Sequence, residues 1–331
     1  MFDYRPILFV IGILLTTLAI AMCVPLVADL VVNNSDWKVF ASSSALTLFI
    51  GVTLILTNQI DTKRFSIRQA FLLTTASWLV MTTFASMPLA FADLGLSFTD
   101  AFFEAMSGIT TTGSTVMIGL DAAPNGILLW RALLQWLGGI GIIVMAVAIL
   151  PMLQIGGMQL FRMESSDRSD KALPRAAQIA GGIGVIYLAL TIVCATALWL
   201  AGFSGFDAIA HSMTTIATGG FSTADGSVGS FRNVAAEVII ILFMILGSLP
   251  FVGYLLAVRG NVSAIWRDVQ VRWFLSVVVF FVLLLTVWHH LSNDVSLPHA
   301  LRFVSFNVVS IITGTGYSST NYGLWGGFAL G

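Results

Sequence analysis

The chain has 331 residues, of which 57% are hydrophobic and only 9% are charged, and its net charge is −1. Soluble domains carry about a quarter charged residues, so this composition excludes an ordinary soluble protein. It predicts an all-α membrane protein that crosses the bilayer several times.

Seven charge-free runs are each long enough to cross a bilayer, which takes roughly 20 residues. They are Pro6–Ala28, Val39–Ile60, Gln69–Ala92, Ala132–Phe161, Ala176–Phe206, Val238–Val258 and Trp273–Asn293. The first two predict a helical hairpin over residues 1–68 that turns at Asn33–Asp36.

The rest of the chain is predicted to repeat one unit: a membrane helix, a short helix, a Thr/Gly segment and a second membrane helix. The first repeat covers residues 69–175, the second 176–270, and the third, incomplete, 271–331. The short helices, expected at Phe98–Gly108, Phe206–Thr215 and Pro298–Ile311, are too short to cross and predict re-entrant segments. The second membrane helices are expected at Pro124–Leu153 and Arg232–Val258. A fourth repeat is absent, so we expect the N-terminal part of a longer protein.

Each Thr/Gly segment is centred on one glycine: Gly113, Gly220 and Gly316, which lie 107 and 96 residues apart. Glu104, His211 and Asn307 all lie nine residues before the central glycine of their repeat. Matching offsets of this kind indicate duplicated structural units.

Irregular Thr/Gly backbone is tolerated at membrane depth where it is buried in protein or lines a water-filled path. Rings of backbone carbonyls can replace the hydration shell of a potassium ion, and glycine supplies the left-handed conformations that point successive carbonyls one way. Tight helix packing is another use of membrane glycines, but it does not explain three copies at matching offsets.

The sequence therefore predicts a cation-selectivity filter. Its residues are Thr111, Thr112, Gly113, Thr218, Gly219, Gly220, Gly314, Thr315 and Gly316. The carbonyls expected to bind potassium are those of Thr112, Gly113, Thr218, Gly219, Gly220, Thr315 and Gly316. Glu104, His211 and Asn307 are expected to brace the filter, because polar groups within a membrane are costly unless paired.

The basic residues indicate the orientation. With the N-terminus and the loops Asp61–Arg68, Arg162–Arg175 and Arg259–Arg272 inside, that side holds 11 of the 15 basic residues. The positive-inside rule then places the N-terminus in the cytoplasm and the three glycine segments on the outer side. An acidic outer vestibule would concentrate cations there.

The segments Phe102–Thr115, His211–Thr223 and Asn307–Ser319 resemble the first three filters of the TrkH/KtrB/HKT superfamily of potassium transporters. Trp130–Gly141, the end at Leu150–Pro151 and the N-terminal hairpin resemble the bacterial TrkH branch. The resemblance implies a pseudo-fourfold pore with one central glycine per repeat, and Gly113 in place of serine favours potassium over sodium.

The resemblance also implies a homodimer in the bacterial inner membrane, surrounded by lipid, with a TrkA-like cytosolic ring of nucleotide-binding subunits facing the basic loops. Potassium would be the substrate, with no covalent cofactor and no nucleic-acid partner. The family's gating loop follows the third filter, where this chain ends, so no gating residue is assigned.

The function expected is potassium uptake, channel-like or coupled to another ion. Two alternatives stay open: a secondary carrier of another solute, since carriers also use broken spans near the midplane, and a non-conducting truncated subunit. We expect no enzyme, because no nucleophile–base pair, metal-ligand cluster or carboxylate dyad stands out.

Overall fold

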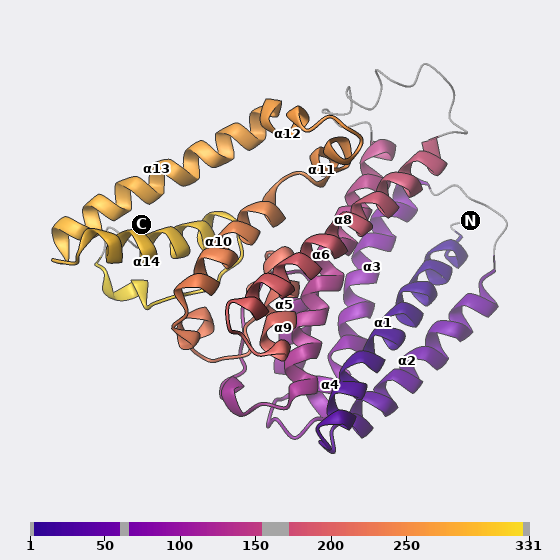
Figure 1. The fold of residues 1–331 in the computed structure, drawn as a ribbon. Helices are drawn as coiled ribbons and strands as arrows, with labels where there is room; N and C mark the ends of the chain where they lie inside the picture. Colours follow the sequence, from indigo (N-terminus) through magenta and orange to yellow (C-terminus); the bar gives the residue numbers. More distant parts are fainter. Residues whose placement is uncertain (1–2, 60–65, 154–171, 327–331) are drawn as a thin grey trace. The chain divides into compact units, whose positions relative to one another are not determined.

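The structure, a computed structural model, describes residues 3–59, 66–153 and 172–326 (Figure 1). Within these ranges every regular element is helical. Five helices are long and apolar enough to cross a membrane, or six if one sharply bent pair counts as a single span. The described residues confirm an all-α, multi-pass membrane protein.

Contacts divide the described residues into two compact units. The first lies within Met1–Thr110, Ser114–Leu134 and Ala148–Ser166, and the second within Thr111–Gly113, Gln135–Val147 and Asp167–Gly331. The helix α6 contributes to both. The repeat boundaries expected from the sequence follow a different criterion and stay predictions.

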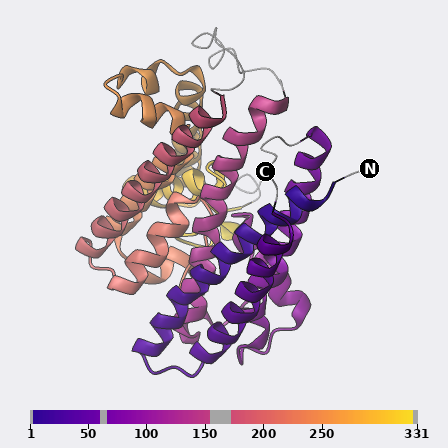
Figure 2. The ribbon, with the colours of Figure 1, turned by 90° about the vertical axis from the view of Figure 1, so that its right-hand side faces the viewer.

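The first unit begins with the predicted hairpin of α1 (Arg5–Val31) and α2 (Trp37–Thr57), which lie side by side (Figure 2). The two backbones approach closely at Gly12 and Gly51. A Cβ atom on Gly12 would lie 2.8 Å from the Gly51 carbonyl oxygen, and one on Gly51 would lie 2.9 Å from the Thr16 nitrogen. Small residues at a membrane helix contact permit this approach.

The remaining helices of the first unit are α3 (Ile67–Ala85), α4 (Met87–Phe91), α5 (Phe98–Ile109) and the beginning of α6 (Asn125–Leu153). Two buried polar contacts fix the start of α6. The Asp29 carboxylate accepts a hydrogen bond from the Gly126 amide at 2.8 Å, and the Trp130 indole donates to the Ala85 carbonyl at 2.9 Å. Helix amides near an N-terminus are natural partners for a carboxylate.

The second unit holds α8 (Ala172–Leu200), α9 (Gly205–Ile216), α10 (Val234–Ser248), α11 (Phe251–Val258), α12 (Ser263–Arg267), α13 (Val269–Ser292) and α14 (Leu297–Ile312). Two of these helices, α9 and α14, are the predicted short helices of the second and third repeats (Figure 1). Helix α9 contacts α8 and α10, and α14 contacts α13 and α10. The predicted loop Arg162–Arg175 lies mostly outside the described residues.

The prediction of one continuous helix over Arg232–Val258 is wrong. The structure has two helices, α10 and α11, bent by 90° at Leu249 and Pro250. A residue before proline is disfavoured in the helical region, and Leu249 is accordingly extended (ψ 151°). The Tyr254 hydroxyl donates to the Leu246 carbonyl at 2.7 Å and thereby satisfies the end of α10.

Candidate cation-binding site

Each of the three short helices ends four residues before the central glycine of its repeat. The Ser97 and Ser204 hydroxyls cap α5 and α9 by accepting from the backbone amides three residues on. The observed bounds agree with the predicted ones to within one residue. A helix C-terminus carries partial negative charge, so each short helix favours a cation beside the segment that follows it.

The backbone of the three segments follows one pattern. Left-handed φ angles occur at the central glycine and two residues before it: Thr111 (58°) and Gly113 (80°), Thr218 (50°) and Gly220 (78°), Gly314 (74°) and Gly316 (85°). This is the alternation expected of a backbone that lines a cation path with carbonyls. A left-handed threonine costs roughly 1–2 kcal/mol, and surrounding structure must hold such a residue in place.

Gly219 is required for a different reason from the one predicted. It was predicted to supply left-handed backbone, but positive φ falls instead on Thr218 and Gly220. A Cβ atom at Gly219 would overlap the side-chain amide of Gln135. The second segment therefore needs glycine here for close packing, which spacing along the chain does not reveal.

Two of the central glycines lie directly against a backbone carbonyl of a neighbouring segment. A Cβ atom on Gly113 would overlap the carbonyl oxygen of Gly219, and one on Gly220 would overlap that of Thr315. Both separations fall below 3.0 Å, a distance that Cβ atoms essentially never show. The two contacts are equivalent. In each, the contacted carbonyl belongs to the residue just before the central glycine of the neighbouring segment.

In the first unit, Glu104 binds the backbone that follows the first segment. Its carboxylate accepts hydrogen bonds from the Thr115 hydroxyl at 2.8 Å and the Val116 amide at 3.0 Å. Arg131 pairs with it, Nε to Oε1, at 2.8 Å, and both side chains are fully buried. Arg131 is one of the four basic residues that the charge distribution leaves outside the cytoplasmic set, and its place in the sequence does not reveal this buried partner.

In the second unit, His211 and Asn307 make the corresponding contacts. His211 Nε2 lies 2.9 Å from the Ser222 hydroxyl, while its Nδ1 lies 2.9 Å from the Asp207 carbonyl. Because a carbonyl can only accept, Nδ1 carries the proton and Nε2 accepts from Ser222 in the neutral ring. The Asn307 amide donates to the Ser319 hydroxyl at 3.0 Å and accepts from the Ser319 amide at 3.3 Å.

Tyr317 is a buried residue of the site that sequence analysis missed. Its hydroxyl contacts the Thr214 hydroxyl and donates to the His211 carbonyl at 3.3 Å, which ties the third segment to α9. The Ser310 hydroxyl donates to the Tyr317 carbonyl at 2.8 Å. An aromatic residue after the central glycine was visible in the sequence, but its partners lie about a hundred residues away.

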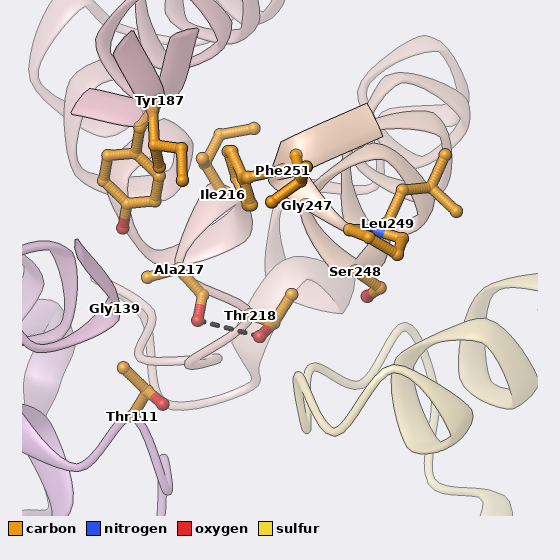
Figure 3. A pocket seen from close by; sticks show the side chains of 13 residues that line it. Thr111, Gly139, Tyr187, Ile216, Ala217, Thr218, Gly247, Ser248, Leu249 and Phe251 are labelled. Carbon is orange, nitrogen blue, oxygen red and sulfur yellow. Dashed lines mark hydrogen bonds between the residues drawn. The ribbon is translucent and has the colours of Figure 1, made fainter. Parts of the chain in front are cut away.

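A cavity of about 430 Å³ adjoins the first residues of two segments (Figure 3). Thr111 and Thr218 contribute to its wall, and the Thr218 hydroxyl donates to the Ala217 carbonyl at 2.8 Å. Opposite them lie Tyr187 and the bend between α10 and α11, from Gly247 to Val252. The bend that the sequence did not predict therefore borders the candidate site.

Fold and site together define a helical membrane protein in which each of three short helices leads into a Thr/Gly segment with left-handed backbone. A family model described as TrkH, cation transport protein, matches residues 37–327. The chain belongs to this TrkH family of cation transport proteins, and the resemblance seen in the sequence is confirmed.

The relatives that the chain matches are named as proteins of the Trk system. The chain is 43% identical over 330 residues to the Trk system potassium uptake protein TrkI of Halomonas elongata, covering 98% of this chain and 66% of the relative. It is 37% identical to the Trk system potassium uptake protein TrkH of Escherichia coli K12, covering 97% and 68%.

The crystal structure of the potassium transporter TrkH from Vibrio parahaemolyticus superposes with a TM-score of 0.90 at 37% identity. The match covers 99% of this chain and 68% of that one. The chain thus spans about two thirds of the length of the relatives it matches.

Proposed function

We propose that the protein takes up potassium, and that its three Thr/Gly segments form part of the selectivity filter. The observation that carries this proposal is the backbone of the segments, where left-handed residues recur at the same two positions in all three copies. The relatives named as Trk system potassium uptake proteins support the same substrate.

Potassium would bind at carbonyl oxygens of Thr112, Gly113, Thr218, Gly219, Gly220, Thr315 and Gly316. The short helices α5, α9 and α14 would add the negative ends of their dipoles. Glu104, His211 and Asn307 would act as braces and not as ligands, since their polar atoms are engaged with the backbone or hydroxyls that follow each segment.

The assembly around this filter is proposed from the sequence and from the relatives. The bias of basic residues supports a cytoplasmic N-terminus in the bacterial inner membrane. The name "Trk system" of the relatives supports a TrkA-like nucleotide-binding ring on the cytosolic face. A homodimer and a choice between channel-like and ion-coupled transport complete the proposal.

Tracer flux into liposomes that contain the purified full chain tests the substrate. We expect ⁸⁶Rb⁺, as a potassium substitute, to enter without any organic solute, and unlabelled K⁺ to compete far better than Na⁺. Uptake that needs an organic solute would indicate a carrier for that solute. Equal competition by Na⁺ and K⁺ would refute a potassium filter.

A further inference from the structure

One side chain holds the second Thr/Gly segment on both sides of its central glycine. Gln135 lies on α6 within the second unit and is fully buried. Its Nε2 donates to the Gly219 carbonyl at 2.6 Å, and its Oε1 accepts from the Phe221 amide at 3.0 Å. The peptide groups flanking Gly220 are thereby fixed to one rigid amide.

This contact requires the chemistry of glutamine. A carboxamide presents a donor and an acceptor in one plane, and the two groups it binds are a carbonyl and an amide two residues apart. Without Gln135, the Phe221 amide would lose this buried acceptor, which disfavours the present orientation of the peptide. Gly219 allows the approach because it has no side chain.

The third segment is held in another way. There the Ser310 hydroxyl, on the segment's own short helix, binds the Tyr317 carbonyl, and the Tyr317 side chain reaches α9. The second segment instead receives its restraint from α6, a helix of the preceding repeat. The restraint acts on the Gly219 carbonyl, which is also the oxygen seated against Gly113.

We propose that Gln135 is a positioning residue that sets the ion specificity of the second filter segment; this inference rests on the proposed potassium filter. By holding the Gly219 carbonyl and the Phe221 amide, Gln135 fixes the peptide planes on either side of Gly220. Selectivity depends on the number and field strength of the carbonyls that face the ion. A released Gly219 peptide could turn toward a smaller ion, so discrimination against sodium would fall.

The test compares the ratio of K⁺ to Na⁺ flux in liposomes for the wild type and two variants. Gln135→Met keeps the length of the side chain and removes both hydrogen bonds, and we expect its ratio to fall about tenfold. The control is Thr191→Val, which removes the partly buried hydrogen bond from the Trp136 indole (3.0 Å) in the same unit without touching a segment. Its ratio should stay within twofold of the wild type.

Gln135→Glu gives a readout that a packing role would not produce. In its neutral form, glutamic acid offers the same donor and acceptor as glutamine, whereas the ionised form has no donor for the Gly219 carbonyl. The flux ratio of Gln135→Glu, relative to the wild type, should therefore fall as the pH rises, while that of Gln135→Met should stay low throughout.

Three results would overturn this assignment: an unchanged ratio for Gln135→Met, an equal fall for Thr191→Val, or a pH-independent ratio for Gln135→Glu. If Gln135→Met does not fold, the pH dependence of the flux ratio in Gln135→Glu still tests the proposal. A wild type that carries sodium as fast as potassium would show instead that the proposed function itself is wrong.

Discussion

At the residue scale, two separate physical requirements explain why the first two segments have a glycine at their centre. Gly113 and Gly220 adopt left-handed φ angles, and each also lies against a carbonyl oxygen of the next segment. The first requirement penalises any side chain modestly, whereas the second leaves no room for a Cβ atom at all. Substitution at these positions should therefore displace an oxygen of the neighbouring segment, which is an effect on ion binding more than on folding.

We expect Gly113→Ser and Gly220→Ala to raise sodium permeation and to lower the K⁺ to Na⁺ flux ratio about tenfold or more, because the carbonyls of Gly219 and Thr315 must move. The matched control is Gly205→Ala, at the exposed start of α9, where a Cβ atom meets nothing within 4 Å. An unchanged ratio in Gly113→Ser would count against the filter assignment.

The ion pair of Glu104 and Arg131 predicts a different kind of effect, on stability. Removing one partner of a buried pair costs about 3–5 kcal/mol because the other charge is left uncompensated, whereas replacing both by apolar residues is often nearly neutral. Glu104→Gln and Arg131→Met should each lower the thermal unfolding temperature in detergent. The double variant should lose less than the sum of the two, and strictly additive losses would show that the pair is not coupled.

At the element scale, the short helices were predictable and the bend in α10–α11 was not. The repeated unit and the glycines that follow placed α5, α9 and α14 to within one residue. The bend depends on Pro250 and on the Tyr254 hydroxyl that satisfies the end of α10. The proline was a visible signal, but the apolar run continued through it and a single span was the simpler interpretation.

Gly247, on α10 just before the bend, packs against the end of α9. A Cβ atom there would lie 2.8 Å from the Ile216 carbonyl oxygen, so Gly247→Ala should push α10 away and destabilise the protein by about 1–3 kcal/mol. Gly181→Ala on α8, where a Cβ atom meets nothing within 4 Å, serves as the control. Equal melting temperatures for both variants in detergent would contradict the contact.

The candidate site was predictable in its backbone and not in its side-chain contacts. The repeat offsets predicted nine filter residues and three braces, and these assignments stay predictions. The structure shows left-handed backbone at matching offsets in all three segments, because duplicated units keep their internal spacing. Gln135 and Tyr317 were missed because their roles depend on partners that lie 84 to 106 residues away. The sequence shows only that a glutamine interrupts an apolar run, which signals a buried partner without naming it.

At the scale of the whole molecule, the orientation in the membrane follows from the distribution of charge and can be tested at the hairpin turn. Ser35 is exposed between α1 and α2. A Ser35→Cys variant without Cys23 and Cys194 should react with a membrane-impermeant maleimide added to intact spheroplasts. Reaction only after permeabilisation would place this turn in the cytoplasm and reverse the proposed topology.

We propose that the three segments bind a dehydrated potassium ion through backbone oxygens. Crystals of the full chain grown in Rb⁺, with anomalous diffraction measured at the rubidium edge, would test it most directly. We predict anomalous peaks among the carbonyls next to Gly113, Gly220 and Gly316, and weaker peaks when Na⁺ replaces most of the Rb⁺. Peaks confined to carboxylates such as Glu104, with none at the three segments, would show that these backbone oxygens do not bind the ion.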